Sequence, residues 1–137
     1  MNIKDVKEWF MIADDDFDSA KILNDAVKKH REIICYHCSQ AIEKYLKGYL
    51  VYNDIVPERT HNLYYLNTVC SEIDKVFETI KKECAVLTRF SSDVRYPHKY
   101  EVTDGDVKFS IEAVEKIRNI ELLKNIREEI IKSDTGI

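Results

Sequence analysis

The sequence predicts an all-α protein that folds as a single up-and-down bundle of five helices. Apolar residues recur at three- and four-residue steps, Gly and Pro are scarce (3 and 2 of 137 residues), and no segment alternates cleanly enough to demand a strand. A chain of this length buries one core and is too short for two. We expect residues 5–131 to form the domain and residues 132–137 to form a flexible C-terminal tail.

The first predicted helix carries an apolar face at helical spacing and an acidic far side. The apolar residues are Val6, Trp9, Ala13, Phe17, Ala20, Leu23 and Val27, and the acidic ones are Asp14, Asp15, Asp16 and Asp18. Successive helical residues point in different directions, so these aspartates cannot converge on one metal ion. We therefore interpret them as a solvated acidic face.

A basic cluster at 28–31 is typical of a helix C-terminus and a short connection, and it predicts that the second helix, from about 31 to 53, returns antiparallel to the first. This helix has an apolar arc at Ile34, Cys38, Ala41, Ile42, Tyr45 and Tyr49. The opposite face carries His37, Gln40, Glu43, Lys44 and Lys47. Because Glu43 and Lys47, like Gln40 and Lys44, are four residues apart, the polar face is either a set of solvated helical pairs or part of an anion site.

The rest of the chain divides at turn and cap residues. Pro57 interrupts the pattern, and Thr60 is the expected cap of a short helix over 61–70. Ser71 or Asp74 is expected to cap a fourth helix that ends near Ser91. Thr103 or Asp104 is expected to cap one final helix whose apolar spacing runs from Val107 to Ile130.

The segment 92–100 lies between the last two helices, and Pro97 excludes regular helix there. Together with the end of the fourth helix it supplies Arg89, Arg95, His98 and Lys99, beside the ring of Tyr96. Arg and His side chains hold phosphate and aromatic rings stack on bases, although the same residues also suit a salt-bridged surface turn. His61, directly after a predicted cap, is either a second anion contact or a structural histidine.

Composition narrows the classes of function. The formal net charge of −4 excludes a uniformly basic nucleic-acid binder, but residues 79–100 hold five Lys or Arg against two acids, whereas residues 1–25 hold three Lys against seven acids. No Gly-rich phosphate loop, HExxH motif, GxSxG motif or Ser-His-Asp order is present. We expect neither a metal nor a cofactor.

Cellular location is predicted from the cysteines and from the apolar segments. No run of residues is long and apolar enough for a membrane span, and the N-terminus lacks a secretory pattern, so we expect a cytoplasmic protein without a membrane partner. Cys35, Cys38, Cys70 and Cys84 are then expected to be reduced and buried. Cys35 and Cys38 form a CxxC, but it falls within a predicted helix and has no second pair at zinc spacing.

Three segments in this order resemble the prokaryotic HEPN domain family: YHCSQAIEKYLK at 36–47, THNL at 60–63 and RYP at 95–97. The Ala- and Asp-rich opening at 13–20 is similar to the start of the same family, and the resemblance covers roughly residues 5–125. It implies a five-helix bundle, a homodimer and a gene beside a minimal nucleotidyltransferase. It also implies nucleotide binding, with ribonuclease activity in several branches.

The ribonuclease branches of that family carry an Arg and a His separated by four to six residues near the end of the bundle. In this chain two residues separate Arg95 from His98, and eight separate Arg89 from His98. Arg31 and His37 have a suitable spacing, but they lie at the start of the second helix, so we interpret this spacing as coincidental. The family's nuclease motif is therefore not found at its expected place.

Our first hypothesis is a HEPN-domain protein that binds a nucleotide or an RNA phosphate and acts with a minimal nucleotidyltransferase in a toxin–antitoxin-like pair. The alternatives are a metal-independent endoribonuclease and a non-catalytic, dimerising helical scaffold. The candidate catalytic residues are Arg95 and His98, with His37 as a weaker acid–base candidate. The candidate nucleotide-binding residues are Gln40, Glu43, Lys44, His61, Arg89 and Tyr96.

Overall fold

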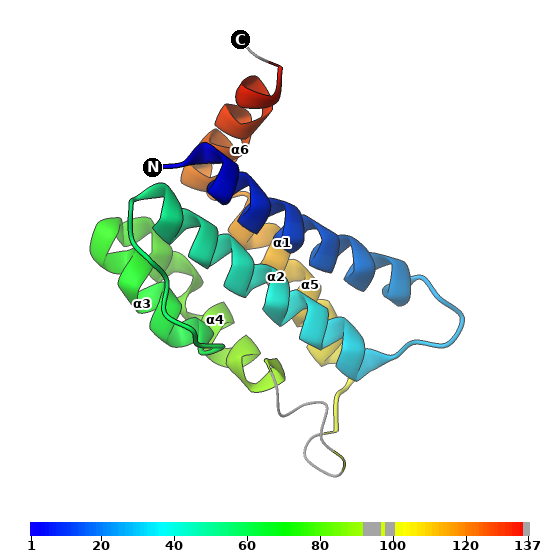
Figure 1. Ribbon diagram of the computed structural model, residues 1–137. Helices are drawn as coiled ribbons and strands as arrows, with labels where there is room; N and C mark the ends of the chain where they lie inside the picture. Colours follow the sequence, from blue (N-terminus) through cyan, green and yellow to red (C-terminus); the bar gives the residue numbers. More distant parts are fainter. Residues whose placement is uncertain (92–96, 98–100, 136–137) are drawn as a thin grey trace.

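A computed structural model, which describes residues 1–91, 97 and 101–135, confirms the all-α class. The described residues form six α-helices and two short 3-10 segments, with no strand (Figure 1). The elements are α1 (Ile3–Asn24), α2 (Arg31–Tyr52), α3 (Leu63–Ile73), η1 (Lys75–Ile80), α4 (Lys81–Leu87), η2 (Thr88–Phe90), α5 (Asp104–Arg118) and α6 (Glu121–Asp134).

The predicted antiparallel hairpin of the first two helices is confirmed, and α1 and α2 lie side by side along their lengths (Figure 1). The buried face of α1 consists of Val6, Phe10, Ala13, Phe17 and Ala20. The two helices approach closely at Gly48 of α2. A Cβ atom there would lie only 2.8 Å from two ring atoms of Phe10, so this contact requires a residue without a side chain.

Helix α2 is the central element of the fold. It packs against α1, α3 and α5 (Figure 1). The side chains of its C-terminal half are buried almost all round. Of the two alternatives for the polar face, a set of solvated helical pairs is therefore wrong for Gln40, Glu43 and Lys47. Gln40, Glu43 and Lys47 are only 8%, 2% and 7% exposed, since neighbouring elements cover the side of α2 that the sequence pattern marks as polar.

The third helix begins at Leu63, two residues later than predicted. Its cap is Asn62, whose side chain accepts a hydrogen bond from the Tyr65 amide, and not Thr60. Asp74 caps the next segment as predicted, by accepting from the Val76 amide. That segment is 3-10 helix before and after α4, so the predicted fourth helix is regular only over its middle.

The C-terminal region differs most from prediction, because the single final helix is broken into α5 and α6. Thr103 begins α5 with a capping box, in which Thr103 and Asp106 bond reciprocally. Asn119 ends α5, and Ile120 adopts an extended conformation before α6. The break turns α6 toward the start of α1 (Figure 1), and α6 remains helical to Asp134, within the region predicted as a tail.

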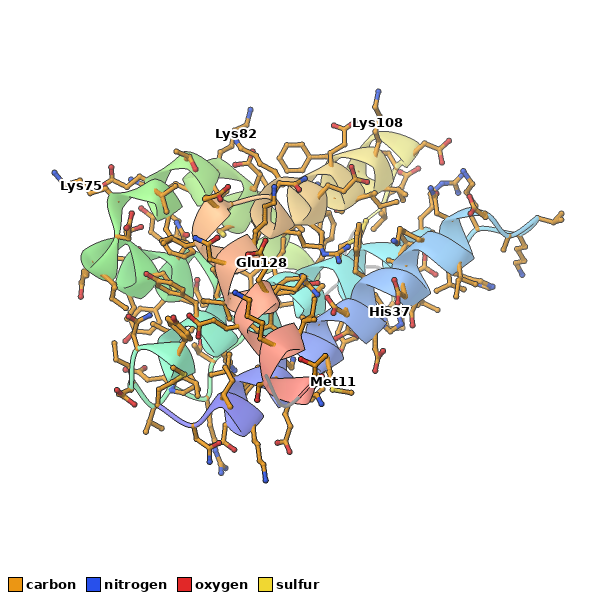
Figure 2. The ribbon with its side chains drawn as sticks, turned by 90° about the horizontal axis from the view of Figure 1, so that it is seen from above. Met11, His37, Lys75, Lys82, Lys108 and Glu128 are labelled. Carbon is orange, nitrogen blue, oxygen red and sulfur yellow. The ribbon has the colours of Figure 1, made fainter. Side chains whose placement is uncertain are left out.

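The four cysteines lie buried in the core with their thiols unpaired, as expected of small apolar side chains. Lysines such as Lys75, Lys82 and Lys108 extend away from the bundle surface (Figure 2). Within the described part of the chain, no helix combines the length and the apolar character that crossing a membrane requires.

Candidate anion-binding site

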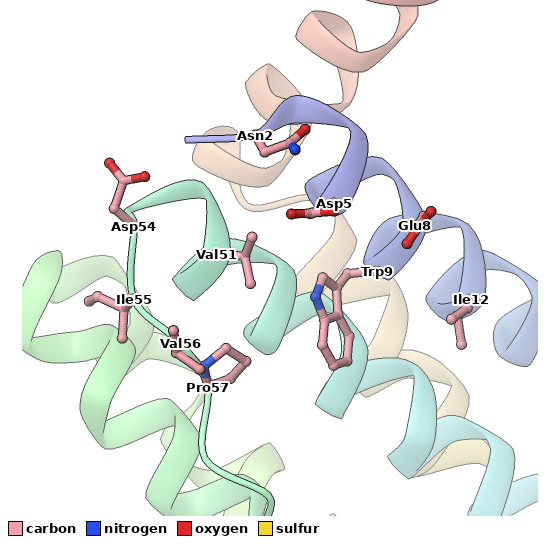
Figure 3. A pocket seen from close by; sticks show the side chains of 10 residues that line it. All are labelled: Asn2, Asp5, Glu8, Trp9, Ile12, Val51, Asp54, Ile55, Val56 and Pro57. Atoms are coloured by element: carbon pink, nitrogen blue, oxygen red, sulfur yellow. The ribbon is translucent and has the colours of Figure 1, made fainter.

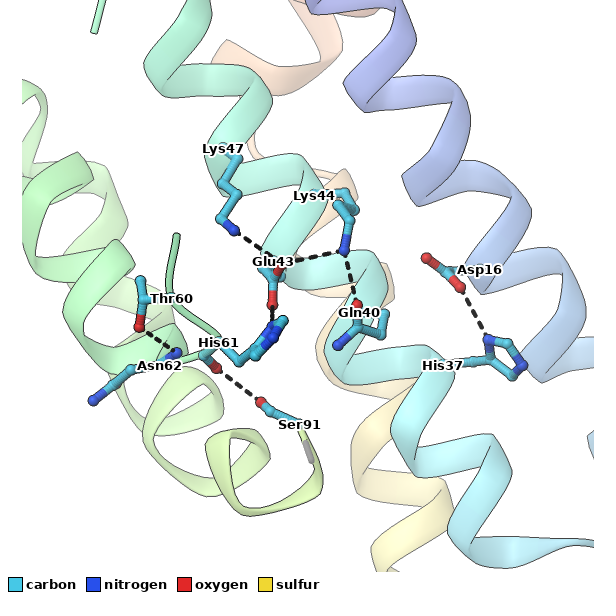
Figure 4. Close-up of polar contacts among 10 residues, drawn as sticks. All are labelled: Asp16, His37, Gln40, Glu43, Lys44, Lys47, Thr60, His61, Asn62 and Ser91. Atoms are coloured by element: carbon cyan, nitrogen blue, oxygen red, sulfur yellow. Dashed lines mark hydrogen bonds and ion pairs between the residues drawn. The ribbon is translucent and has the colours of Figure 1, made fainter. Parts of the chain in front are cut away.

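The polar face of α2 forms a compact ion-pair cluster around Glu43. One carboxylate oxygen, Oε1, lies 2.7 Å from Nδ1 of His61. The other, Oε2, accepts from Nζ of Lys44 at 3.1 Å and from Nζ of Lys47 at 3.0 Å (Figure 4). Lys44 also donates to Oε1 of Gln40 at 2.8 Å. We call Gln40, Glu43, Lys44, Lys47 and His61 the Glu43 cluster.

Glu43 is ionised in this environment. Its burial on its own raises the pKa, but the hydrogen bond from His61 and the ammonium groups of Lys44 and Lys47 together outweigh burial and lower it. The cluster therefore pairs one negative charge with two lysines. It keeps a surplus positive charge even when His61 is neutral.

His61 is the most accessible member of the cluster, with 62% of its side chain exposed. An ionised carboxylate only accepts hydrogen bonds, so Nδ1 of His61 carries the proton and Nε2 is the nitrogen left for another contact. The His61 backbone carbonyl accepts from Oγ of Ser91 at 2.9 Å (Figure 4). This bond holds Ser91, the last described residue before 92–96, beside the cluster.

The structure brings four of the predicted nucleotide-binding residues together: Gln40, Glu43, Lys44 and His61. Arg89 has different partners: its guanidinium donates to Asp106 of α5 at 2.7 Å and lies over the Phe90 ring. Arg95, Tyr96 and His98 lie outside the described residues.

The weaker candidates have other partners. Nδ1 of His37 lies 2.9 Å from Asp16 of α1, and Arg31 pairs with Asp104 at 2.7 Å. Because His37 and Arg31 are each held by a different carboxylate, the structure agrees with a coincidental spacing of these two residues.

One member of the Glu43 cluster, Lys47, and one residue bonded to that cluster, Ser91, were not among the predicted site residues. Lys47 belongs to the predicted polar face, and its spacing of four from Glu43 was the available signal. Ser91 had no signal, because its partner His61 lies 30 residues away along the chain.

A second ion-pair site surrounds Asp14, which the sequence pattern marked as solvated. Arg127 of α6 donates to both carboxylate oxygens, at 2.7 and 2.9 Å, and the Tyr45 hydroxyl also donates to Asp14. Burial raises the pKa of Asp14, but the hydrogen bonds from Arg127 and Tyr45 lower it overall. Asp14 therefore ties α1 to α2 and α6.

No three His, Cys, Asp or Glu side chains converge as metal ligands within residues 1–91, 97 and 101–135. What the described residues present is an all-helical domain whose central helix buries an ionised carboxylate under two lysines and an exposed histidine. The chain is therefore an all-helical protein with a positively charged cluster around a buried carboxylate of its central helix.

A family model described as HEPN domain matches residues 6–128, which is most of the chain. The chain therefore belongs to the HEPN domain family, and the resemblance noted in the sequence is confirmed. Comparison with curated proteins gave no match, and comparison with solved structures gave none either.

Proposed function

We propose that this HEPN-domain protein binds the phosphate of a nucleotide or of RNA at the Glu43 cluster. The observation that supports the proposal is the surplus positive charge of Lys44 and Lys47 over Glu43, beside an exposed imidazole. Lysine and histidine donors form charge-assisted hydrogen bonds with phosphate oxygens. Lys44 is the ammonium best placed for this role, since 17% of its side chain is exposed against 8% for Lys47.

Glu43 has a positioning role in this proposal. Its two oxygens orient His61 and both lysines, so the donors are arranged before a ligand arrives. Pre-arranged donors lower the entropy lost on binding. Arg95 and Tyr96 follow Ser91 closely in sequence and stay predicted contacts for the phosphate and the base.

The test is a calorimetric and thermal-shift titration of the purified protein with ATP, GTP and a short RNA. A ligand at about one hundred times its dissociation constant stabilises the folded state by about 2.7 kcal/mol, which raises the melting temperature measurably. Lys44→Met should weaken binding at least tenfold. Lys75→Met, which changes a lysine of η1 that extends away from the bundle surface (Figure 2), should leave it unchanged. The absence of a shift with all three ligands would overturn the proposal.

A metal-independent endoribonuclease is the second candidate, and the orientation of His61 is the observation that favours it. A carboxylate that holds Nδ1 leaves Nε2 to accept the proton of a ribose 2′-hydroxyl. The 2′-oxygen would then bond to the adjacent phosphorus as the bond to the 5′-oxygen breaks, with Arg95 and His98 as the predicted charge-stabilising and proton-donating residues.

Incubation with total RNA in EDTA separates the two candidates. Cleavage that survives EDTA and is lost in His61→Gln, Arg95→Ala and His98→Ala favours the nuclease. Intact RNA, together with ligand binding in the titration, favours the binding module alone.

We further propose that the protein is a cytoplasmic homodimer that acts with a minimal nucleotidyltransferase in a toxin–antitoxin-like pair. The family assignment supports this proposal, because the resemblance implies both partners. The test is co-expression with the product of the neighbouring reading frame, followed by sedimentation of the copurified material. A monomer at micromolar concentration with no copurifying protein would contradict it.

A further inference from the structure

A hollow of about 550 Å³ lies at the other end of α2 from its junction with the 25–30 turn, between the first turns of α1 and the segment 54–57. Figure 3 shows Trp9 on one side of it and Val56 and Pro57 on the other. Val51 of α2 also lines it. We call this hollow the Trp9 groove.

The Trp9 groove is apolar and open to solvent. Val56 is 89% exposed and Ile12, also part of its lining, is 48% exposed. Apolar side chains exposed together around a concave surface mark a place where another apolar group is buried on binding.

The charged residues of the groove are all acidic. Asp5, Glu8 and Asp54 line it, and none of the described Lys, Arg or His residues does. The Met1 amino group pairs with Asp54 at 2.5 Å, whereas Asp5 and Glu8 have no ion-pair partner among the described residues. Two free carboxylates one helical turn apart favour a cation beside the apolar surface.

The groove is formed in advance of binding. The segment 54–57 leaves α2 through a Schellman turn, in which Ile55 donates to the Leu50 carbonyl at 2.9 Å and Asp54 donates to the Val51 carbonyl at 3.0 Å. Asp54 takes the left-handed conformation that this turn requires, with φ of 60°. Trp9 is held at its Cβ beside Gly48, and Lys47 Nζ lies 5.9 Å from its ring centroid.

We propose that the Trp9 groove docks a peptide segment of a partner protein in which an apolar side chain is flanked by Lys or Arg. The apolar side chain enters between Trp9, Val56 and Pro57, and the flanking cations meet Asp5 and Glu8. The peptide proposed for the Trp9 groove is positively charged, whereas the phosphate proposed for the Glu43 cluster is negatively charged. The inference is therefore independent of the proposed function.

Trp9 is the chain's single tryptophan, so its fluorescence reports on the groove directly. The probe is a blocked hexapeptide of alternating Lys and Leu, titrated into the full chain at low salt. We expect a saturable change in Trp9 emission that weakens at high salt, because exposed charges are screened. Two matched peptides, one with Glu for Lys and one with Ser for Leu, should bind at least tenfold more weakly.

Substitutions in the chain test whether the peptide binds at the Trp9 groove. The double variant Asp5→Asn/Glu8→Gln and the single variant Val56→Ser should each weaken binding at least fivefold, with unchanged helical circular dichroism. Glu112→Gln, an exposed carboxylate on α5, should leave it unchanged. The proposal is overturned if no saturable change occurs up to millimolar peptide, or if the acidic peptide binds as well as the basic one. It is also overturned if Glu112→Gln weakens binding equally, or if Trp9 emission tracks self-association, which would assign the groove to a second copy.

Discussion

Replacing Glu43 with leucine tests whether the Glu43 cluster is held together by its buried carboxylate. The side chain is 2% exposed and faces two ammonium groups, of which Lys47 is 8% exposed. Leucine fills a similar volume but leaves Lys47 buried without a counter-charge. Removing one partner of a buried ion pair costs about 3–5 kcal/mol of unfolding free energy. With a urea slope of about 2 kcal/mol per molar, the unfolding midpoint should fall by about 2 M.

A double-mutant cycle isolates the interaction and keeps the test valid if the single variant folds poorly. Adding Lys47→Met to Glu43→Leu removes the unpaired ammonium and should recover part of the loss. The expected coupling energy is about 1–3 kcal/mol. The control cycle uses Lys7 and Asp134, whose side chains are 38% and 48% exposed, and should give less than about 0.5 kcal/mol. A loss below about 1 kcal/mol for Glu43→Leu, or a coupling no larger than the control, would refute the reasoning.

Three further predictions concern acid stability, helix packing and thiol reactivity. The pKa values of Glu43 and Asp14 are lowered by folding, so the stabilisation they give is complete above their ordinary values of 4.5 and 3.8 and is lost as pH falls below them. Urea unfolding from pH 7 to pH 3 should show this decline, and Glu43→Gln should make it shallower; an unchanged profile would contradict the assignment. Gly48→Ala should destabilise the protein by about 1–3 kcal/mol through its clash with Phe10, despite the higher helix propensity of alanine. Gly105→Ala, whose Cβ would meet only Thr103 at 3.6 Å, should be neutral or stabilising by up to about 1 kcal/mol in the same melts, and equal effects of the two would argue against a close α1–α2 contact. Burial raises the pKa of Cys35 to about 11 and that of Cys70 to about 12, and raises those of Cys38 and Cys84 as well. A disulfide reagent at pH 8 should therefore label four thiols per chain in guanidinium and almost none in the native protein, and rapid native labelling would show an accessible thiol.

The all-α class and the first two helices were predictable because their apolar spacing is local and regular. The break at Asn119 and Ile120 was not, since Ile117, Ile120 and Leu123 keep helical spacing through it. The break lets α6 pack against α1 as well as α5, and that contact is not visible in the apolar spacing. Apolar periodicity describes each helix on its own, so it does not show where contacts with other helices interrupt a helix.

The candidate site shows the same limit. The placement of Gln40, Glu43 and Lys44 together on one face of α2 was predictable from their spacing, but the burial of Gln40 and Glu43 and the contact of His61 with Glu43 were not. A polar helix face is exposed to solvent only if no other element covers it. The elements that cover α2 come from elsewhere in the chain. Asp14 is the clearest case, because its main partner, Arg127, lies 113 residues later.

That separation has a consequence for the order in which the parts of the chain can fold. Asp14 and Tyr45 both precede Arg127 in the chain, so α1 and α2 can pack together before the guanidinium that compensates the Asp14 carboxylate has been synthesised. A chain that terminates before Arg127 leaves a half-buried carboxylate without its strongest partner. Chains in which α6 is missing or undocked should therefore be cut by proteases more readily than chains in which Arg127 pairs with Asp14.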